Sequence, residues 1–369
     1  MSGSDTGVDR AELRAAARDM LDDLSGSEQV RARLAEPATD PLWSHLVEVG
    51  WTGIDVPEDS GGAGADFGDL AVVLVEGGRH LAPGTLFASA VLAGGALQAN
   101  PSPASGRWLP ALAEGTARGT AALADATGRV DAAGITARAE GSGWVLDGTS
   151  ALVPSAEGAD ILILRARTPD DELLVAVPGD TAGLTITPAP MLDLTRSFAD
   201  VTVTGLAVGP EAVLASGAEG AAAVAALLDR AAVAIAADSL GIADVVLSGT
   251  VEYVGQREQF DRPVGSFQAV KHRCTDMLVA TETARLIVEE AADQPGDPIS
   301  ASRAKSYATD AAASVAAEAV QLHGGIGVTW EQDSHLYLKR ATLNQALYGD
   351  PRSHRRRLAD LTLTPAAVH

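Results

Sequence analysis

Cysteines and basic residues are scarce in this chain of 369 residues. The single cysteine, Cys274, excludes a disulfide within the chain, which favours a reducing compartment. The 27 lysines and arginines are outnumbered by 49 aspartates and glutamates, so the net charge is −22. Because nucleic acids and anionic membranes attract basic surfaces, we expect neither as a partner.

Long apolar runs are also missing. The first ten residues are polar and lack the apolar centre of a signal peptide. The alanine-rich stretch 219–237 is interrupted by Asp229 and Arg230, so we do not expect it to span a membrane. These absences predict a cytoplasmic location.

The hydrophobic pattern predicts an α+β protein with three domains. Residues 1–118 have helical spacing and predict an N-terminal helical domain. Residues 119–209 change to a period of two with frequent turn residues, which predicts a small antiparallel barrel or sandwich. Residues 210–369 return to helical spacing and predict a four-helix bundle, with helices at about 218–255, 266–292, 300–322 and 332–347.

Two segments carry a family resemblance. Residues 257–272 read REQFDRPVGSFQAVKH, and residues 321–331 read QLHGGIGVTWE. Both resemble signatures of the acyl-CoA dehydrogenases, in the family's order and at its spacing. The loop 51–64 and the run 193–196 add to a resemblance that covers nearly the whole chain.

The resemblance implies an enzyme that uses FAD to oxidise an acyl thioester, either acyl-CoA or a carrier-protein thioester, to its α,β-unsaturated form. In the family a carboxylate removes the α proton while the β hydrogen leaves as hydride to the flavin. The resemblance also implies a homo-oligomer or a pairing with a paralogous dehydrogenase subunit. The electron acceptor would be similar to an electron-transfer flavoprotein.

The family holds the adenine-diphosphate half of FAD with residues of a neighbouring subunit. A guanidinium can bond two phosphate oxygens at once, and paired glycines let the backbone approach the dinucleotide. The matching positions here are Arg257, Gln259, Phe260, Gln268, Gln321, Gly324 and Gly325. The alternative is that Arg257 is a surface residue and that the paired glycines only end a helix.

The flavin-ring side departs from the family pattern. The family's T-E-P-x-x-G-S-D loop corresponds to LADATGRVD at 123–131, and its G-x-K-x-x-I-T-N-A element corresponds to GTSALVPSA at 148–156. Ser150 stands in place of the lysine and Pro154 in place of the threonine. Since proline has no amide hydrogen, at least one usual flavin contact is lost or altered.

The catalytic base is a second departure. The usual glutamate position falls on Tyr348, and a tyrosine, with an ordinary pKa of about 10, cannot be the base at neutral pH. Some members carry the glutamate early in the first bundle helix, just before an arginine, which makes Asp229 the candidate base. The alternative is an ion pair between Asp229 and Arg230, or a residue one turn away.

Other polar residues predict no further site. His272 and His323 belong to no Cys/His/Glu cluster, so we expect no metal. The arginines near the C-terminus are expected to be solvated or paired with acidic groups rather than bound to a CoA phosphate; they are Arg352, Arg355, Arg356 and Arg357.

Three functions fit these observations. The chain can be the FAD-gripping subunit of a hetero-oligomeric dehydrogenase, a self-sufficient homo-oligomer with Asp229 as base, or a non-catalytic scaffold. The departures lie on one half of the flavin site while the other half is intact. A decayed scaffold should lose both halves, so the sequence favours the gripping subunit.

Overall fold

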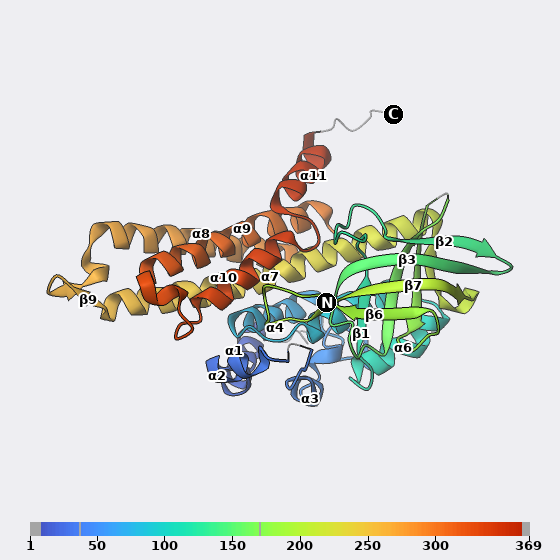
Figure 1. Ribbon diagram of the computed structural model, residues 1–369, viewed down its shortest axis with the longest axis horizontal. Coiled ribbons are helices and arrows are strands. Elements are labelled where there is room, and N and C mark those ends of the chain that lie inside the picture. The colour runs from blue at the N-terminus through green and yellow to red at the C-terminus, as the bar shows by residue number, and fades with distance from the viewer. Residues whose placement is uncertain (1–8, 37, 170, 364–369) are drawn as a thin grey trace, which may run out of the picture.

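The computed structural model describes residues 9–36, 38–169 and 171–363. Figure 1 shows a layer of N-terminal helices beside a long helical bundle, with a β-sheet at one end of both. The predicted order of helical domain, β domain and bundle is confirmed. The N-terminal helices are α1 (Arg10–Leu24), α2 (Ser27–Arg33), α3 (Trp43–Glu48), α4 (Phe67–Arg79), α5 (Gly95–Ala99) and α6 (Pro103–Ala113), with 3-10 turns at Trp51–Gly53 and Glu58–Ser60.

Local sequence explains where the first helices begin. Asp9 caps α1 by accepting hydrogen bonds from the backbone N–H groups of Ala11 and Glu12. Asp66 and Asp69 form a reciprocal capping box at the start of α4. A π-helix, η3 (Phe87–Gly94), runs directly into α5.

The central domain is one eight-stranded sheet in the order β6-β7-β3-β2-β4-β5-β8, with β1 paired to β4. Its strands are β1 (Gly119–Ala122), β2 (Ile135–Glu140), β3 (Gly143–Pro154), β4 (Ile161–Arg167), β5 (Glu172–Pro178), β6 (Leu184–Pro188), β7 (Phe198–Val208) and β8 (Val213–Ser216).

Two expectations for this domain need correction. The sheet is mixed rather than antiparallel, because β1 and β2 both run parallel to β4. The sheet also extends past residue 209, since β8 pairs with β5. The strand is short and follows the turn at Pro210–Ala212, so its alternation is too brief to read from sequence.

The bundle consists of α7 (Gly217–Gln256), α8 (Gln268–Ala292), α9 (Pro298–His323), α10 (Ser334–Ala346) and α11 (Pro351–Leu363). The last helix was not predicted, so the bundle has one helix more than expected. Pro351 suits a first helical turn, and the Asp350 carboxylate accepts a hydrogen bond from the Ser353 N–H (2.6 Å). Few residues of the arginine-rich α11 are apolar, so the sequence shows no helical hydrophobic pattern there, and the helix was missed in spite of these start signals.

Helix α7 is the centre of the molecule. By length and composition it is apolar enough to cross a membrane, but 83% of the apolar stretch is buried within the protein. Helices α4, α8 and α9 pack along it. Its apolar surface is therefore explained by internal packing.

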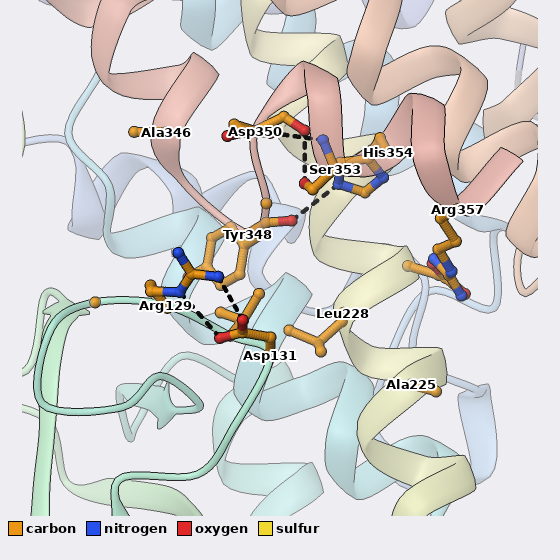
Figure 2. Close-up of a pocket in the computed structure, with 14 residues that line it drawn as sticks. Arg129, Asp131, Ala225, Leu228, Ala346, Tyr348, Asp350, Ser353, His354 and Arg357 are labelled. Carbon is orange, nitrogen blue, oxygen red and sulfur yellow. Dashed lines mark hydrogen bonds and ion pairs between the residues drawn. The ribbon is translucent and has the colours of Figure 1, made fainter. Parts of the chain in front are cut away.

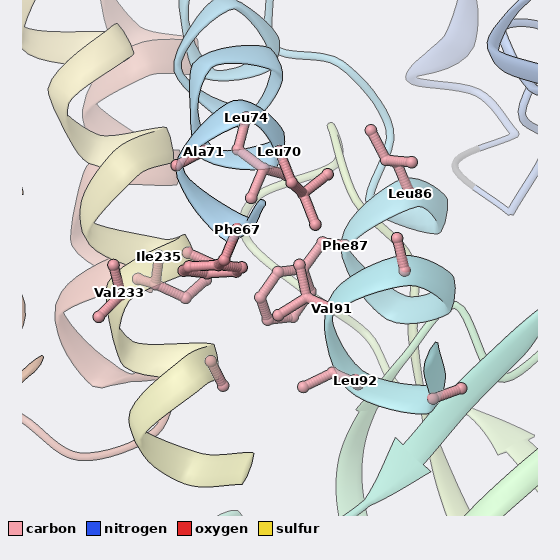
Figure 3. Close-up of a cluster of buried hydrophobic side chains, with 14 of the residues drawn as sticks. Phe67, Leu70, Ala71, Leu74, Leu86, Phe87, Val91, Leu92, Val233 and Ile235 are labelled. Carbon is pink, nitrogen blue, oxygen red and sulfur yellow. The ribbon is translucent and has the colours of Figure 1, made fainter. Parts of the chain in front are cut away.

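The core between α7 and the N-terminal helices is filled by large side chains. Figure 3 shows Phe67 of α4, Phe87 and Val91 of η3 and Ile235 of α7 meeting in this space. Each of these side chains is buried. Burial of one such side chain contributes about 1.5–3 kcal/mol, so this contact joins the two helical layers firmly.

A buried polar network joins all three domains at Asp238 of α7. Its carboxylate accepts hydrogen bonds from Arg196 of the β domain (2.7 Å), Arg340 of α10 (2.8 Å) and Asn344 of α10 (2.7 Å). Arg340 also donates to the carbonyl oxygen of Ala82 (2.8 Å). Burial, together with the neighbouring Arg340, lowers the pKa of Arg196 to about 10. Arg196 thus fixes the β domain against the bundle.

Candidate functional site

A cavity of about 530 Å³ lies where the β domain, α7 and the end of the bundle meet. Figure 2 shows its walls, which come from the loop 128–131, one face of α7, and the turn between α10 and α11. The lining residues include both positions at which the family carries its base, Asp229 and Tyr348. The structure therefore brings together two candidates that are far apart in the sequence.

Asp229 is 4% exposed and engaged by an arginine from the last helix. Arg357 contacts both of its carboxylate oxygens: Nη1 donates to Oδ1, and Nη2 donates to Oδ2 at 2.9 Å. The hydrogen bond to Asp229 raises the pKa of Arg357. The expected alternative partner, Arg230 or a residue one turn away, is wrong, because the partner lies 128 positions along the chain.

Arg230 points to a different side of α7 from Asp229 and does not line the cavity. It forms an ion pair with Asp55 and donates to the carbonyl oxygen of Val91 (3.1 Å) in the π-helix. Its guanidinium lies 4.4 Å from the ring centre of Phe67. Arg230 therefore ties α7 to the N-terminal helices and is not part of the cavity wall.

Tyr348 occupies the usual base position on the turn between α10 and α11. Its backbone has a φ of 54°, and Gly349 follows with a φ of 96°. The ring centre lies 5.7 Å from that of Phe87. Burial raises the pKa of Tyr348 above its ordinary value, so the side chain is a neutral phenol at neutral pH.

Two buried bases hold this turn by its carbonyl groups. Lys305 of α9 is fully buried, and its Nζ donates to Gln345 O (3.2 Å) and Gly349 O (2.7 Å). His354 Nε2 lies 3.0 Å from Tyr348 O, so Nε2 carries the proton. Sequence reasoning missed both residues, since a lysine and a histidine within helical segments carry no distinguishing motif.

The loop that replaces the family's T-E-P element is held together by hydrogen bonds to its own aspartate, Asp125. Asp125 Oδ1 accepts hydrogen bonds from the N–H of Thr127 (2.7 Å), its hydroxyl (2.7 Å) and the N–H of Arg129 (3.0 Å). Asp125 O accepts from the N–H of Gly128 (3.0 Å) and of Ala151 (3.1 Å). The bonds from Thr127 and Arg129 to its carboxylate lower the pKa of Asp125, and the amides of Thr127, Gly128 and Arg129 are engaged within the loop.

Strand β3 offers few donors beside this loop. The N–H of Leu152 donates to Asp200 Oδ1 (3.2 Å), and Pro154 has none to donate. The hydroxyl of Ser150, at the family's lysine position, is buried without a partner. The residues present therefore do not fit the flavin ring in this half of the site.

The seven predicted dinucleotide residues lie at one end of the bundle, which we call the bundle tip. It comprises the end of α7, the hairpin of β9 (Glu258–Gln259) and β10 (Arg262–Pro263), the start of α8 and the end of α9. Tyr253 stacks on His323 with ring centres 4.3 Å apart, which joins the ends of α7 and α9. All seven residues are exposed; they are Arg257, Gln259, Phe260, Gln268, Gln321, Gly324 and Gly325.

The hairpin of the bundle tip holds an unusual residue. Phe260 is 87% exposed and has a φ of 57°, a left-handed conformation that bulky residues rarely adopt. Such strain is often retained where a side chain has a binding role. The bundle tip fits the dinucleotide half of FAD, because its arginine, its glutamines and its paired glycines are all accessible.

The remaining predicted polar groups form no metal site. His323 donates to the carbonyl oxygen of Ala319 (2.8 Å) inside α9. Within the described ranges, no group of three His, Cys, Asp or Glu side chains could hold a metal ion. Two of the C-terminal arginines pair with carboxylates, Arg355 with Asp310 (2.7 Å) and Arg357 with Asp229.

The fold and the motifs are those of the acyl-CoA dehydrogenases, and comparison with known proteins agrees. Residues 8–116 match the N-terminal domain of acyl-CoA dehydrogenases, and residues 218–362 match their C-terminal domain. The chain belongs to the acyl-CoA dehydrogenase family. Members of this family are oxidoreductases that act on CH–CH bonds.

Relatives resemble the chain over almost its whole length. Acyl-CoA dehydrogenase IpdE2 of Mycolicibacterium smegmatis is 35% identical over 355 residues, which cover 95% of this chain and 97% of the relative. A variant of the Tcur3481-Tcur3483 steroid ACAD is 33% identical, with a TM-score of 0.88 over 96% of this chain and 97% of that one. The ChsE4-ChsE5 complex from Mycobacterium tuberculosis is 29% identical, with a TM-score of 0.89 over 98% and 99%.

Proposed function

We propose that this chain is the FAD-gripping subunit of a hetero-oligomeric acyl-CoA dehydrogenase. A paralogous chain would supply the flavin-ring half of the site and the catalytic glutamate. The proposal rests on the asymmetry of the site. The motif residues of the bundle tip are exposed, whereas the cavity side lacks usual flavin contacts and its candidate base is bonded to an arginine.

The bundle tip supports the gripping role. Arg257 is exposed, and no described carboxylate lies within ion-pair distance of it, so its guanidinium is available for a pyrophosphate. Gln321, Gly324 and Gly325 would lie along the dinucleotide. FAD, when bound, accepts the β hydrogen of the acyl group as hydride.

The cavity side supports assigning the ring and the base to another chain. In the loop after β1, the amides of Thr127 and Arg129 bond to Asp125, and Pro154 has no amide hydrogen. Asp229, the base of the self-sufficient alternative, is bonded through both oxygens by Arg357. A non-catalytic scaffold has no need of the accessible motif residues at the bundle tip.

Two solved relatives support a two-chain enzyme. One is the ChsE4-ChsE5 complex, and the other is the Tcur3481-Tcur3483 steroid ACAD. We therefore propose a bulky, steroid-type acyl thioester as substrate. We also propose a cytoplasmic location and an acceptor similar to an electron-transfer flavoprotein.

Flavin content tests the proposal. The chain purified alone should retain little flavin absorbance near 450 nm, and a complex with its paralogue should carry one FAD per pair of chains. Arg257→Ala should weaken flavin binding to that complex by about 30-fold, corresponding to about 2 kcal/mol for a charge-assisted contact. Arg138→Ala, an exposed change in β2, is the matched control.

Two results would contradict this function. One is a full complement of flavin in the chain alone that an acyl thioester bleaches. The other is an unchanged flavin affinity in the Arg257→Ala complex while Arg138→Ala behaves identically.

A further inference from the structure

A second cavity, of about 370 Å³, lies on a different side of α7 from the cavity at Asp229. Its walls come from the start of α4, helix α5, the first half of α7 and the loop between α8 and α9. Small apolar side chains form part of the wall; they are Ala65, Ala96, Ala99, Ala223, Ala226 and Leu227. The two cavities share no lining residue, so the second is a separate place for a ligand.

The guanidinium of Arg230 lies in the wall of the second cavity with one nitrogen unused. Its Nε donates to Val91 O (3.1 Å), and its Nη2 donates to Asp55 Oδ2. Nη1 is accessible, and no described residue bonds it. Gly95 leaves room for the group, since a Cβ at this position would lie 2.5 Å from Nε. The cavity therefore offers a donor that is held in place before a ligand arrives.

Two side-chain amides supply acceptors. Gln98 Nε2 donates to Asp55 O (2.7 Å), and Asn100 Nδ2 donates to Ala96 O (2.8 Å). Because a carbonyl oxygen can only accept, each NH₂ group must face the main chain. Both residues line the second cavity, and among the described residues no donor reaches Oε1 of Gln98 or Oδ1 of Asn100.

The charged groups around the second cavity are paired with one another. Asp55 is 5% exposed and forms an ion pair with Arg230. Asp66 pairs with Arg10 at 2.8 Å. A charged ligand would therefore meet no unpaired counter-charge, and a neutral group is favoured. A primary carboxamide has one acceptor oxygen and two N–H donors, which match the free donor and the two free acceptors.

We propose that the second cavity is a binding site for a primary carboxamide on an apolar body. The carboxamide oxygen would accept from Arg230 Nη1, and its N–H groups would donate to Gln98 and Asn100. The bound ligand would lie against the ion pair that joins α7 to the N-terminal helices. This site goes beyond the proposed function and does not depend on it.

A matched pair of ligands tests the site on the full chain. Para-fluorobenzamide carries the primary carboxamide, and para-fluoroacetophenone replaces its NH₂ by a methyl group of similar size. Fluorine NMR titration should show that the amide binds about tenfold more tightly, the net effect of its neutral hydrogen bonds. Gln98→Met removes one acceptor, so it should weaken binding of the amide alone, by about 3- to 10-fold.

Two substitutions on α7 locate the bound ligand. Ala226 is exposed in the wall of the second cavity, so Ala226→Trp should fill the space and abolish binding of both compounds. Ala225 is also exposed but lines the cavity at Asp229. Ala225→Trp is therefore the matched control and should leave both affinities unchanged.

The proposal is overturned if neither compound binds, if the two bind equally well, or if the amide preference survives Gln98→Met. It is also overturned if Ala225→Trp, rather than Ala226→Trp, removes binding. Each measurement is made without flavin or a partner chain, so these outcomes are independent of the test of the proposed function.

Discussion

A carboxylate that removes a proton from carbon needs an oxygen that no stronger donor occupies. Asp229 lacks one, because Arg357 bonds both of its oxygens from the far end of the chain. The pair fastens α11 to α7 across the cavity. At the residue scale, Asp229 therefore holds the last helix against α7 rather than acting as a base.

Asp229→Asn should destabilise the protein rather than impair catalysis. Breaking a fully buried ion pair costs about 3–5 kcal/mol, but the Arg357 side chain is 36% exposed, so we expect about 1–2 kcal/mol. Urea unfolding measures this loss. Substrate-dependent bleaching of flavin in the assembled complex should change by less than about threefold, whereas loss of a general base would cost at least about a hundredfold.

Arg357→Gln is the matched control for that prediction. It should cost a similar amount, and the double variant should be less destabilised than the sum of the two single changes. A hundredfold loss of bleaching with unchanged stability would instead identify Asp229 as the base.

At the scale of elements, the turn between α10 and α11 is held in place by several separate contacts. Two consecutive residues, Tyr348 and Gly349, have positive φ, and Lys305 and His354 hold the turn through three carbonyl groups. Burying a lysine without a carboxylate partner is costly, so the lysine is expected to affect stability in a pH-dependent way.

Burial lowers the pKa of Lys305 to about 7, from an ordinary 10.5. Between these values the unfolded chain binds a proton that the folded chain has lost, so the free energy of unfolding rises with pH, by at most about 1.4 kcal/mol per pH unit. Wild type should therefore gain on the order of 2 kcal/mol relative to Lys305→Met between pH 7 and pH 9. Urea unfolding at the two pH values measures the difference.

Lys271→Met, a change at an exposed lysine of α8, should keep the wild-type pH slope. If wild type and Lys305→Met unfold with parallel pH profiles, Lys305 does not titrate as its burial indicates.

At the scale of the whole molecule, the outer side of α8 exposes several large apolar residues although the chain is strongly acidic. Leu278, Val279 and Leu286 are all exposed on this helix, which lies at the edge of the bundle in Figure 1. Neighbouring exposed apolar residues commonly mark an interface. The bundle tip also needs another chain if it is to hold FAD.

We expect a dimer or tetramer assembled through the bundle, either alone or with a paralogue. Leu286→Asp should shift the assembly toward smaller species in light scattering at micromolar concentration, because it places a charge in the interface. Leu361→Asp, an exposed apolar position on α11, should leave the assembly intact. A strictly monomeric wild-type chain in the presence of its paralogue would contradict the prediction.

The sequence alone determined the order of domains, the positions of the long bundle helices and the motif residues of the bundle tip. Helical and strand periodicity are local properties, and the tip residues sit in two short segments whose ends happen to meet. Arg257 and Gln321 are both exposed, and their role toward the dinucleotide stays a prediction.

Only the tertiary structure decided how the distant charges pair. Asp229 and Arg357 are 128 positions apart, and Asp238 meets arginines from two other elements. No local pattern encodes such partners, because which guanidinium reaches a buried carboxylate depends on how whole helices pack. The same packing decided that β1 and β2 run parallel to β4, that the arginine-rich tail is a helix, and that the position of the family's base carries a neutral phenol facing a cavity.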